Sequence, residues 1–175
     1  MSLRPLTMDD AEQILEWRNS PRVAAFMYTN EPISLTDHMQ WLQGALESSA
    51  ARYWMIEHRG NDVGVANLAD IDRRNQRCSW AFYLGAPDVP GPVAVGVEFE
   101  IMGIVFGEMG FHKLISEVLG FNERVIDMHE RAGFVREGRL RDHIQRNDGT
   151  HDVVVLSMLR PEWEERHEPR WRKRR

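Results

Sequence analysis

The sequence predicts a single α/β domain in which a mixed sheet carries helices on both faces. Its 175 residues suit one domain with a substantial core and are short for two. Strand-like and helix-like apolar patterns follow one another in the order β-α-α-β-β-β-α-β-α-β-β. Residues 87–92 are rich in proline and glycine. They lie where a run of strands is followed by helices and strands in alternation. We therefore expect them to form a loop inside one domain.

A capping motif precedes each of the first two helices. Thr7 and Asp10 form a variant of the capping box, and their helix should stop before Pro21, which disfavours helical geometry in the residue before it. Residues 34–37 supply a second Ser-x-x-Asp cap, for a helix that reaches residue 46. The strands of this half are expected at residues 3–6, 52–59, 62–71 and 76–86, with a tight turn joining the second and third.

The second half predicts two further helices and three further strands. An apolar segment at 93–110 predicts a long helix, and residues 122–132 predict another that Gly133 closes. The strands are expected at 112–119 and on both sides of the turn at 147–149.

Composition narrows the functional classes. A net charge of −5 argues against general binding to nucleic acid or membranes, which favour a positive protein surface. The single cysteine, Cys78, excludes an internal disulfide framework, and the opening residues contain no apolar signal segment. We therefore expect a cytoplasmic protein. No histidines or cysteines have metal-binding spacing, so we expect no metal site.

The predicted helices and strands lie within residues 1–163, and we expect this range to form the single folded domain. Residues 164–175 end in a basic run and are expected to form a solvated, flexible tail. Such a run is also found in segments that bind nucleic acid or anionic lipid.

The predicted helix at 122–132 separates an apolar arc from a charged one, at about 100° per residue. His129 lies near the middle of the apolar arc, and Asn122 lies in the same sector. A histidine there is commonly a core residue, but the same face can also approach a ligand. No GxSxG motif and no Ser/His/Asp set for nucleophilic catalysis is recognisable.

Residues 87–96 predict an anion site at the start of the long helix. Pro92 suits the first helical turn, where its missing N–H would have no helical partner in any case. The free N–H groups there and the positive end of the helix dipole attract anions. The candidate contacts are Gly91, Val93, Ala94, Val95 and Gly96. An ordinary strand–loop–helix corner would have the same pattern.

An arginine and several aromatic residues gather between residues 17 and 42. Aromatic rings can stack on a base or sugar, and arginine can pair with phosphate. The candidate substrate-binding residues are Arg18, Met27, Tyr28, His38 and Trp41. The alternatives are that Phe26, Met27 and Trp41 cap the core, and that Arg18 and His38 form a surface pair.

The order of elements, the loop before the long helix and the Asn…Gly-Phe ending of residues 122–134 resemble the GCN5-related N-acetyltransferases (GNAT family). The likeness covers nearly the whole chain. It implies a mostly antiparallel sheet with two splayed central strands, at 78–86 and 113–119. It also implies acetyl-CoA as cosubstrate, with its pyrophosphate at the anion site and its arm between the splayed strands.

This sequence departs from the family pattern in two places. The phosphate-loop pattern Q/R-x-x-G-x-G/A is met only at Gly91, with Asp88 and Val93 at the flanking positions. The thiolate's proton donor is usually a tyrosine in that family, and His129 occupies that position here.

The blocks WRNSP, FMYTNEPISLTDHMQWL, FYLG and SEVLGFNERVIDMHERAGF are similar to nucleotide-sugar N-acetyltransferases of pseudaminic acid biosynthesis. This resemblance implies acetylation of the 4-amino group of a UDP-linked amino-dideoxy sugar. It places the five candidates from Arg18 to Trp41 beside the nucleotide-sugar, with Tyr83 at the sugar end. Glu117 would lie near the amine and Asn122 near the CoA arm.

The implied chemistry is direct acyl transfer from the thioester to the amine. Backbone N–H groups from Phe82 to Leu84 would polarise the carbonyl, and Glu117 would accept the amine's proton. An imidazole has a pKa of about 6.5 in water, and burial lowers it. We therefore expect His129 to stabilise the departing sulfur rather than act as a strong acid, unless a carboxylate such as Glu117 holds it cationic.

Two other functions fit the sequence. One is a protein N-terminal acetyltransferase of the ribosomal-protein type, and the other is a CoA-binding interaction module without catalysis. The expected partner is a UDP-amino-sugar or another small amine, and the sequence leaves a homodimer open.

Overall fold

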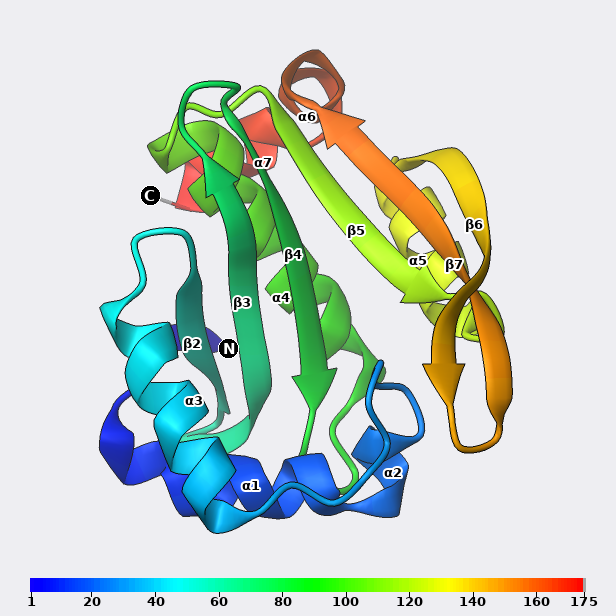
Figure 1. The fold of residues 1–175 in the computed structure, drawn as a ribbon. Helices are drawn as coiled ribbons and strands as arrows, with labels where there is room; N and C mark the ends of the chain where they lie inside the picture. The colour runs from blue at the N-terminus through cyan, green and yellow to red at the C-terminus, as the bar shows by residue number, and fades with distance from the viewer. Residues whose placement is uncertain (175) are drawn as a thin grey trace.

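The computed structural model describes residues 1–174, which form one seven-stranded sheet with helices on both faces (Figure 1). The strands are β1 Ser2–Pro5, β2 Arg52–His58, β3 Asn61–Asp72, β4 Arg77–Leu84, β5 Lys113–Leu119, β6 Val135–Arg146 and β7 Gly149–Leu159. The helices are α1 Ala11–Asn19, α2 Pro21–Ala24, α3 Leu35–Glu47, α4 Gly91–Met102, α5 Glu123–Ala132, α6 Arg160–Arg166 and α7 Glu168–Arg174. The predicted α/β fold with a mixed sheet is confirmed.

The sheet order is β1-β2-β3-β4-β5-β7-β6, and every neighbouring pair is antiparallel except β4 and β5. Helices α1, α2 and α3 lie on one side of the sheet, and α4 and α5 lie on the other (Figure 1). Because side chains alternate along a strand, each face carries its own core. Met55 and Val65 pack towards α1 and α3, whereas Ile56 and Ala66 pack towards α4.

The predicted helix caps are present. The Thr7 N–H donates to the Asp10 carboxylate at 2.8 Å, in a short 3-10 turn that leads into α1. At the start of α3, Ser34 Oγ accepts from the Asp37 N–H at 3.1 Å. Each cap satisfies an N–H that the helix itself cannot pair.

The central strands β4 and β5 separate along their length. Their parallel ladder contains three residue pairs and ends at Ser79 and Ile115. Beyond that point β4 stays paired with β3 as far as Leu84, and β5 stays paired with β7 as far as Leu119. The inner edges of both strands therefore lack a ladder partner where the ribbons diverge (Figure 1).

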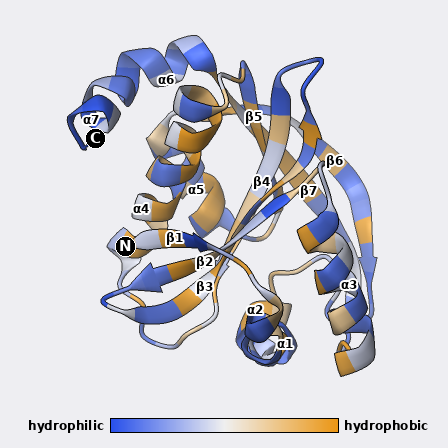
Figure 2. Cartoon of the chain, turned by 90° about the vertical axis from the view of Figure 1, so that its left-hand side faces the viewer, coloured by the Kyte–Doolittle hydropathy of each residue, from blue (hydrophilic) through white to orange (hydrophobic). Residues whose placement is uncertain are grey.

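The C-terminal residues differ from the expected flexible tail. Residues 164–174 form the end of α6, a turn at His167 and α7, and Trp163 and Trp171 are buried. Gly103 and Gly107, in the π-helical segment Gly103–Glu108 after α4, make room for the Trp171 ring, since a Cβ at Gly103 would lie 2.3 Å from it. The two tryptophans anchor a segment whose many charges suggested a solvated tail (Figure 2). Residue 175 lies outside the described residues.

We expect Trp171→Ala to lower the free energy of unfolding by about 3–5 kcal/mol, because it empties a buried site that two glycines shape. Urea denaturation followed by circular dichroism measures the change. Arg172→Ala is the matched control, since the neighbouring Arg172 side chain is 75% exposed. Equal effects of the two variants would contradict the packing of α7.

Candidate active site

A cavity of about 1420 Å³ opens where β4 and β5 diverge, and residues from both faces of the sheet line it. It brings together most of the predicted site residues. Those in its lining are Arg18, Met27, Tyr28, Trp41, Phe82, Tyr83, Leu84, Gly91, Ala94, Val95, Glu117, Asn122 and His129.

Three predicted contacts do not line the cavity, and the predictions of direct contact are corrected for them. His38 is 1% exposed and lies beside the Trp41 ring, because residues three and four apart share a helix face and His38 and Leu42 both face the core. Burial, with a smaller effect of the Arg18 charge, lowers the pKa of His38. The Val93 side chain belongs to the core, and Gly96 lies against Met1.

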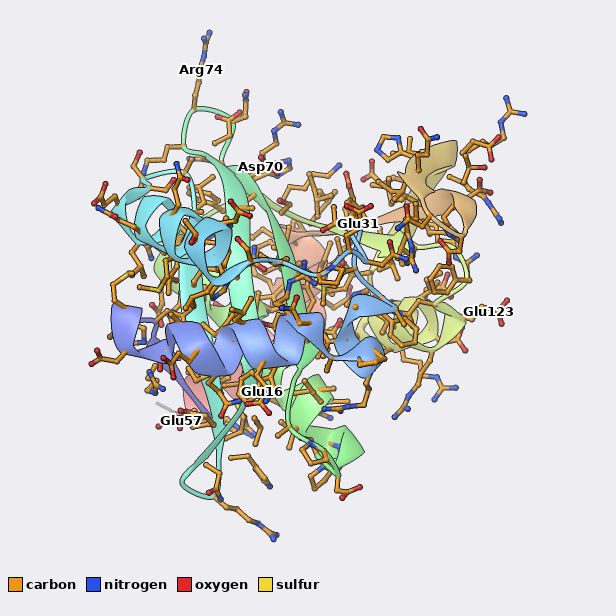
Figure 3. The ribbon with its side chains drawn as sticks, turned by 60° about the horizontal axis from the view of Figure 1, so that its bottom comes forward. Glu16, Glu31, Glu57, Asp70, Arg74 and Glu123 are labelled. Atoms are coloured by element: carbon orange, nitrogen blue, oxygen red, sulfur yellow. The ribbon has the colours of Figure 1, made fainter. Side chains whose placement is uncertain are left out.

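On the α4 and α5 side of the sheet, three buried side chains form a hydrogen-bonded chain. His129 Nδ1 lies 2.6 Å from Glu98 Oε1, and His129 Nε2 lies 3.1 Å from Ser116 Oγ. The Trp80 and Phe134 rings pack against the imidazole at 5.2 and 5.3 Å between centroids. The periodicity correctly placed His129 on the inner face of α5, whose outer residue Glu123 extends away from the protein (Figure 3).

Sequence reasoning missed Glu98 and Ser116. Glu98 is a carboxylate inside an apolar helical segment, and it is 1% exposed. Ser116 stands between Leu114 and Val118 at the inward positions of β5. A polar residue in an apolar periodicity is the signal that could have identified both, since buried polar groups require partners.

Glu117 points to the opposite face from Ser116, because neighbouring strand residues alternate. Its carboxylate accepts a hydrogen bond from the Tyr28 hydroxyl at 2.9 Å. Burial, assisted by the Glu117 hydrogen bond and charge, raises the pKa of Tyr28, so the phenol stays protonated and donates. The carboxylate that pairs with His129 is therefore Glu98, and not Glu117 as the sequence suggested.

The α1–α3 side of the cavity contains an arginine without an acidic partner. Arg18 Nη1 is buried with no hydrogen-bond partner, and no acidic group of the described residues forms an ion pair with it. Burial lowers the pKa of Arg18. The Tyr83 hydroxyl is likewise buried without a partner, and the rings of Trp41 and Tyr53 meet edge to face at 5.4 Å.

The predicted anion site at the start of α4 has fewer free N–H groups than expected. Pro92 has none, and the Val93 N–H donates to the Pro90 carbonyl at 2.9 Å. Side chains add positive charge to this side of the cavity: its lining includes Arg124, Arg131 and Arg170. The carboxylate of Asp88 also lines the cavity.

The single cysteine lies in the core and does not line the cavity. Burial raises the pKa of Cys78 to about 12, so its thiol is an inert part of the core. Within residues 1–174, no group of histidine, cysteine and acidic side chains is arranged to hold a metal ion, and no helix is long and apolar enough to cross a membrane.

Residues 1–135 match the Acetyltransferase (GNAT) domain family. The chain belongs to this family. It is 28% identical over 136 residues to the SPbeta prophage-derived uncharacterized N-acetyltransferase YokL of Bacillus subtilis. The aligned residues cover 78% of this chain and 77% of that protein. It is 22% identical to Acetyltransferase PseH of Campylobacter jejuni over 74% of this chain and 79% of PseH.

A solved structure of spermidine N-acetyltransferase from Vibrio cholerae, in complex with CoA and spermine, has the same fold. It superposes with a TM-score of 0.85 at 21% identity, over 93% of this chain and 97% of the other. The predicted GNAT fold and the acetyl-CoA-dependent N-acetyltransferase activity are thereby confirmed at the level of the family.

Proposed function

We propose that this GNAT enzyme acetylates the 4-amino group of a UDP-linked amino-dideoxy sugar. The unpaired guanidinium of Arg18 is the observation that carries the proposal. Arg18 is half-buried, and a partly buried cation without an anionic partner costs stability, so the site gains stability when a ligand supplies negative charge. A nucleotide diphosphate supplies that charge, and the rings of Trp41 and Tyr53 provide surfaces on which a base or sugar can pack.

A polyamine fits this side of the cavity less well. The Vibrio cholerae enzyme binds spermine, but a polycation bound here would meet Arg18 and Arg22. The acidic side chains on this side are Asp70 and Glu117, and the Glu117 carboxylate already accepts from Tyr28. The two cations and two carboxylates are equal in number, so the preference for an anionic acceptor with one reactive amine rests on Arg18, which has no acidic partner among the described residues.

The reaction requires a proton acceptor for the amine and a donor for the thioester carbonyl oxygen. In this proposal Glu117 accepts the amine's proton, which its position in the lining of the cavity supports. The unpaired inner edge of β4, between Trp80 and Leu84, offers backbone N–H groups that can polarise the carbonyl. With acetyl-CoA bound, these groups permit direct transfer without a covalent enzyme intermediate.

A thermal-shift screen with and without acetyl-CoA tests the acceptor, because a ligand that binds only the folded protein raises its melting temperature. We expect a UDP-linked 4-amino-dideoxy sugar to raise the melting temperature more than spermidine or a ribosomal-protein N-terminal peptide does. A larger shift with spermidine or with the peptide would overturn the proposal and favour that acceptor class.

Arg18→Met should weaken binding of the sugar nucleotide about 10- to 100-fold, since a hydrogen bond to a charged group contributes about 1.5–3 kcal/mol. Isothermal titration calorimetry measures this change. Arg141→Met is the control, because Arg141 is exposed on β6 and does not line the cavity. Unchanged affinity in Arg18→Met would remove the charge argument for a nucleotide acceptor.

A further inference from the structure

The chain of Glu98, His129 and Ser116 lies inside the active-site cavity, yet the steps above use none of its links. The exposed fractions of the Glu98 and His129 side chains are both 2%, and that of Ser116 is also 2%. All three residues line the cavity. Together they connect α4, α5 and β5 through two buried hydrogen bonds.

The position of Ser116 links this chain to the gap in the sheet. The β4–β5 ladder ends at Ile115, so Ser116 is the first residue of β5 beyond the last pair. Its backbone still pairs with Leu156 of β7, which holds the side chain in place. Its hydroxyl therefore stands where the two central strands begin to part.

Both ring nitrogens of His129 are already engaged, Nδ1 by Glu98 and Nε2 by Ser116. The imidazole consequently has no free N–H to offer a bound ligand. A serine hydroxyl can accept one hydrogen bond and donate another at the same time. The path from the imidazole to a ligand therefore passes through Ser116 Oγ.

Glu98 gives the imidazole of His129 a carboxylate partner away from water. An ionised carboxylate away from water needs a cationic partner, and within the described residues the imidazole of His129 is the one basic group paired with it. An imidazolium at this position would donate from both nitrogens, so that Nε2–H would point to Ser116 Oγ and leave the hydroxyl proton free to be given away.

We propose that Ser116 is the residue that protonates the departing thiolate, and that His129, held by Glu98, resupplies its proton. When the new C–N bond forms, the C–S bond breaks and the sulfur leaves with the electron pair. Ser116 gives its hydroxyl proton to that sulfur while His129 Nε2 gives its proton to Ser116 Oγ. The serine is unchanged, and the proton released by the amine restores the imidazolium through solvent.

The role of Ser116 does not depend on which acceptor the enzyme uses. Either proposal, the role of Ser116 or the sugar nucleotide as acceptor, can therefore fail while the other stands. The proposed role of Ser116 replaces a direct role of His129 at the sulfur with a positioning and proton-supplying role. The same three residues with a neutral imidazole would instead activate Ser116 as a nucleophile. Ser116 sits within a regular, paired strand rather than on a sharp strand-to-helix turn of the kind that exposes nucleophilic serines.

A binding experiment tests the contact without turnover. We expect Ser116→Ala to bind CoA about 3- to 10-fold more weakly than the unmodified protein, the effect of one lost hydrogen bond, and to bind desulfo-CoA equally well. Ser157→Ala is the control, because Ser157 is a buried serine on the adjacent strand β7 and does not line the cavity. Equal losses for CoA and desulfo-CoA would overturn the contact with sulfur.

Kinetics test the proton transfer. With acetyl-CoA, Ser116→Ala should lower kcat about 10²-fold with little change in KM, and Ser116→Thr should recover much of the activity because it retains the hydroxyl. The loss should shrink with the selenoester analogue of acetyl-CoA, whose selenolate leaves readily without a proton. An undiminished loss with the selenoester, or acetylated Ser116 found by mass spectrometry without acceptor, would overturn the proposal.

Discussion

Glu117→Gln should lower kcat about 10²- to 10⁴-fold, because the amide can still accept the hydrogen bond from Tyr28 but cannot take a proton from the amine. The change is nearly isosteric and Glu117 is exposed, so folding should be unaffected. Thiol release under saturating acetyl-CoA and acceptor measures the loss.

Tyr28→Phe is the matched control for that variant. It removes the 2.9 Å hydrogen bond to Glu117 but leaves the carboxylate, so kcat should fall much less. If Glu117→Gln retains full kcat, or if the two variants lose activity equally, Glu117 is not the proton acceptor.

His129→Phe should lower kcat about 10²-fold, the usual size for a removed acid–base group. Phenylalanine fills the volume beside Trp80 but cannot pass a proton to Ser116, and it leaves Glu98 buried without a partner. Because an unpaired buried charge costs about 3–5 kcal/mol, thermal melting must accompany the kinetic measurement.

His129→Gln separates the two effects. Glutamine can hydrogen-bond to both Glu98 and Ser116 and should preserve more stability, but it carries no transferable proton at neutral pH. We expect its kcat to stay low although the protein is folded. Full activity in either folded variant would show that the imidazole takes no part in proton transfer.

The elements with strong local signals could be predicted from the sequence. Thr7 and Asp10 form the expected cap, and Gly133 ends α5 with a φ of 103°, a left-handed conformation that glycine adopts without strain. The order of strand-like and helix-like patterns also predicted helices on both faces of the sheet. These features depend on residues close together in the chain, so a single sequence contains the information.

The site contacts were harder to predict because they depend on which helix face meets the sheet. His38 has the chemistry of a binding residue, but its helix turns it towards Leu42 and the core. Glu98 and Ser116 lie 31 and 13 residues from His129, and no local pattern joins them. Their pairing follows from the packing of α4 and α5 on the same face of the sheet.

The C-terminal region shows the converse difficulty. Its charges predicted a solvated segment, whereas Trp171 docks on a surface that Gly103 and Gly107 leave open. The complementary surface lies more than sixty residues earlier, in a π-helical segment that the apolar pattern does not distinguish from an ordinary helix.

The proposed acceptor of this N-acetyltransferase is the amine of a nucleotide-linked sugar. The most direct test of this proposal is the rate of CoA release from acetyl-CoA with three acceptors at equal concentration: a UDP-linked 4-amino-4,6-dideoxy sugar, spermidine and a ribosomal-protein N-terminal peptide. The charge and aromatic lining of the cavity predict the highest kcat/KM for the sugar nucleotide, with acetylation at its 4-amino group confirmed by mass spectrometry. A higher kcat/KM for spermidine or the peptide would contradict the proposal.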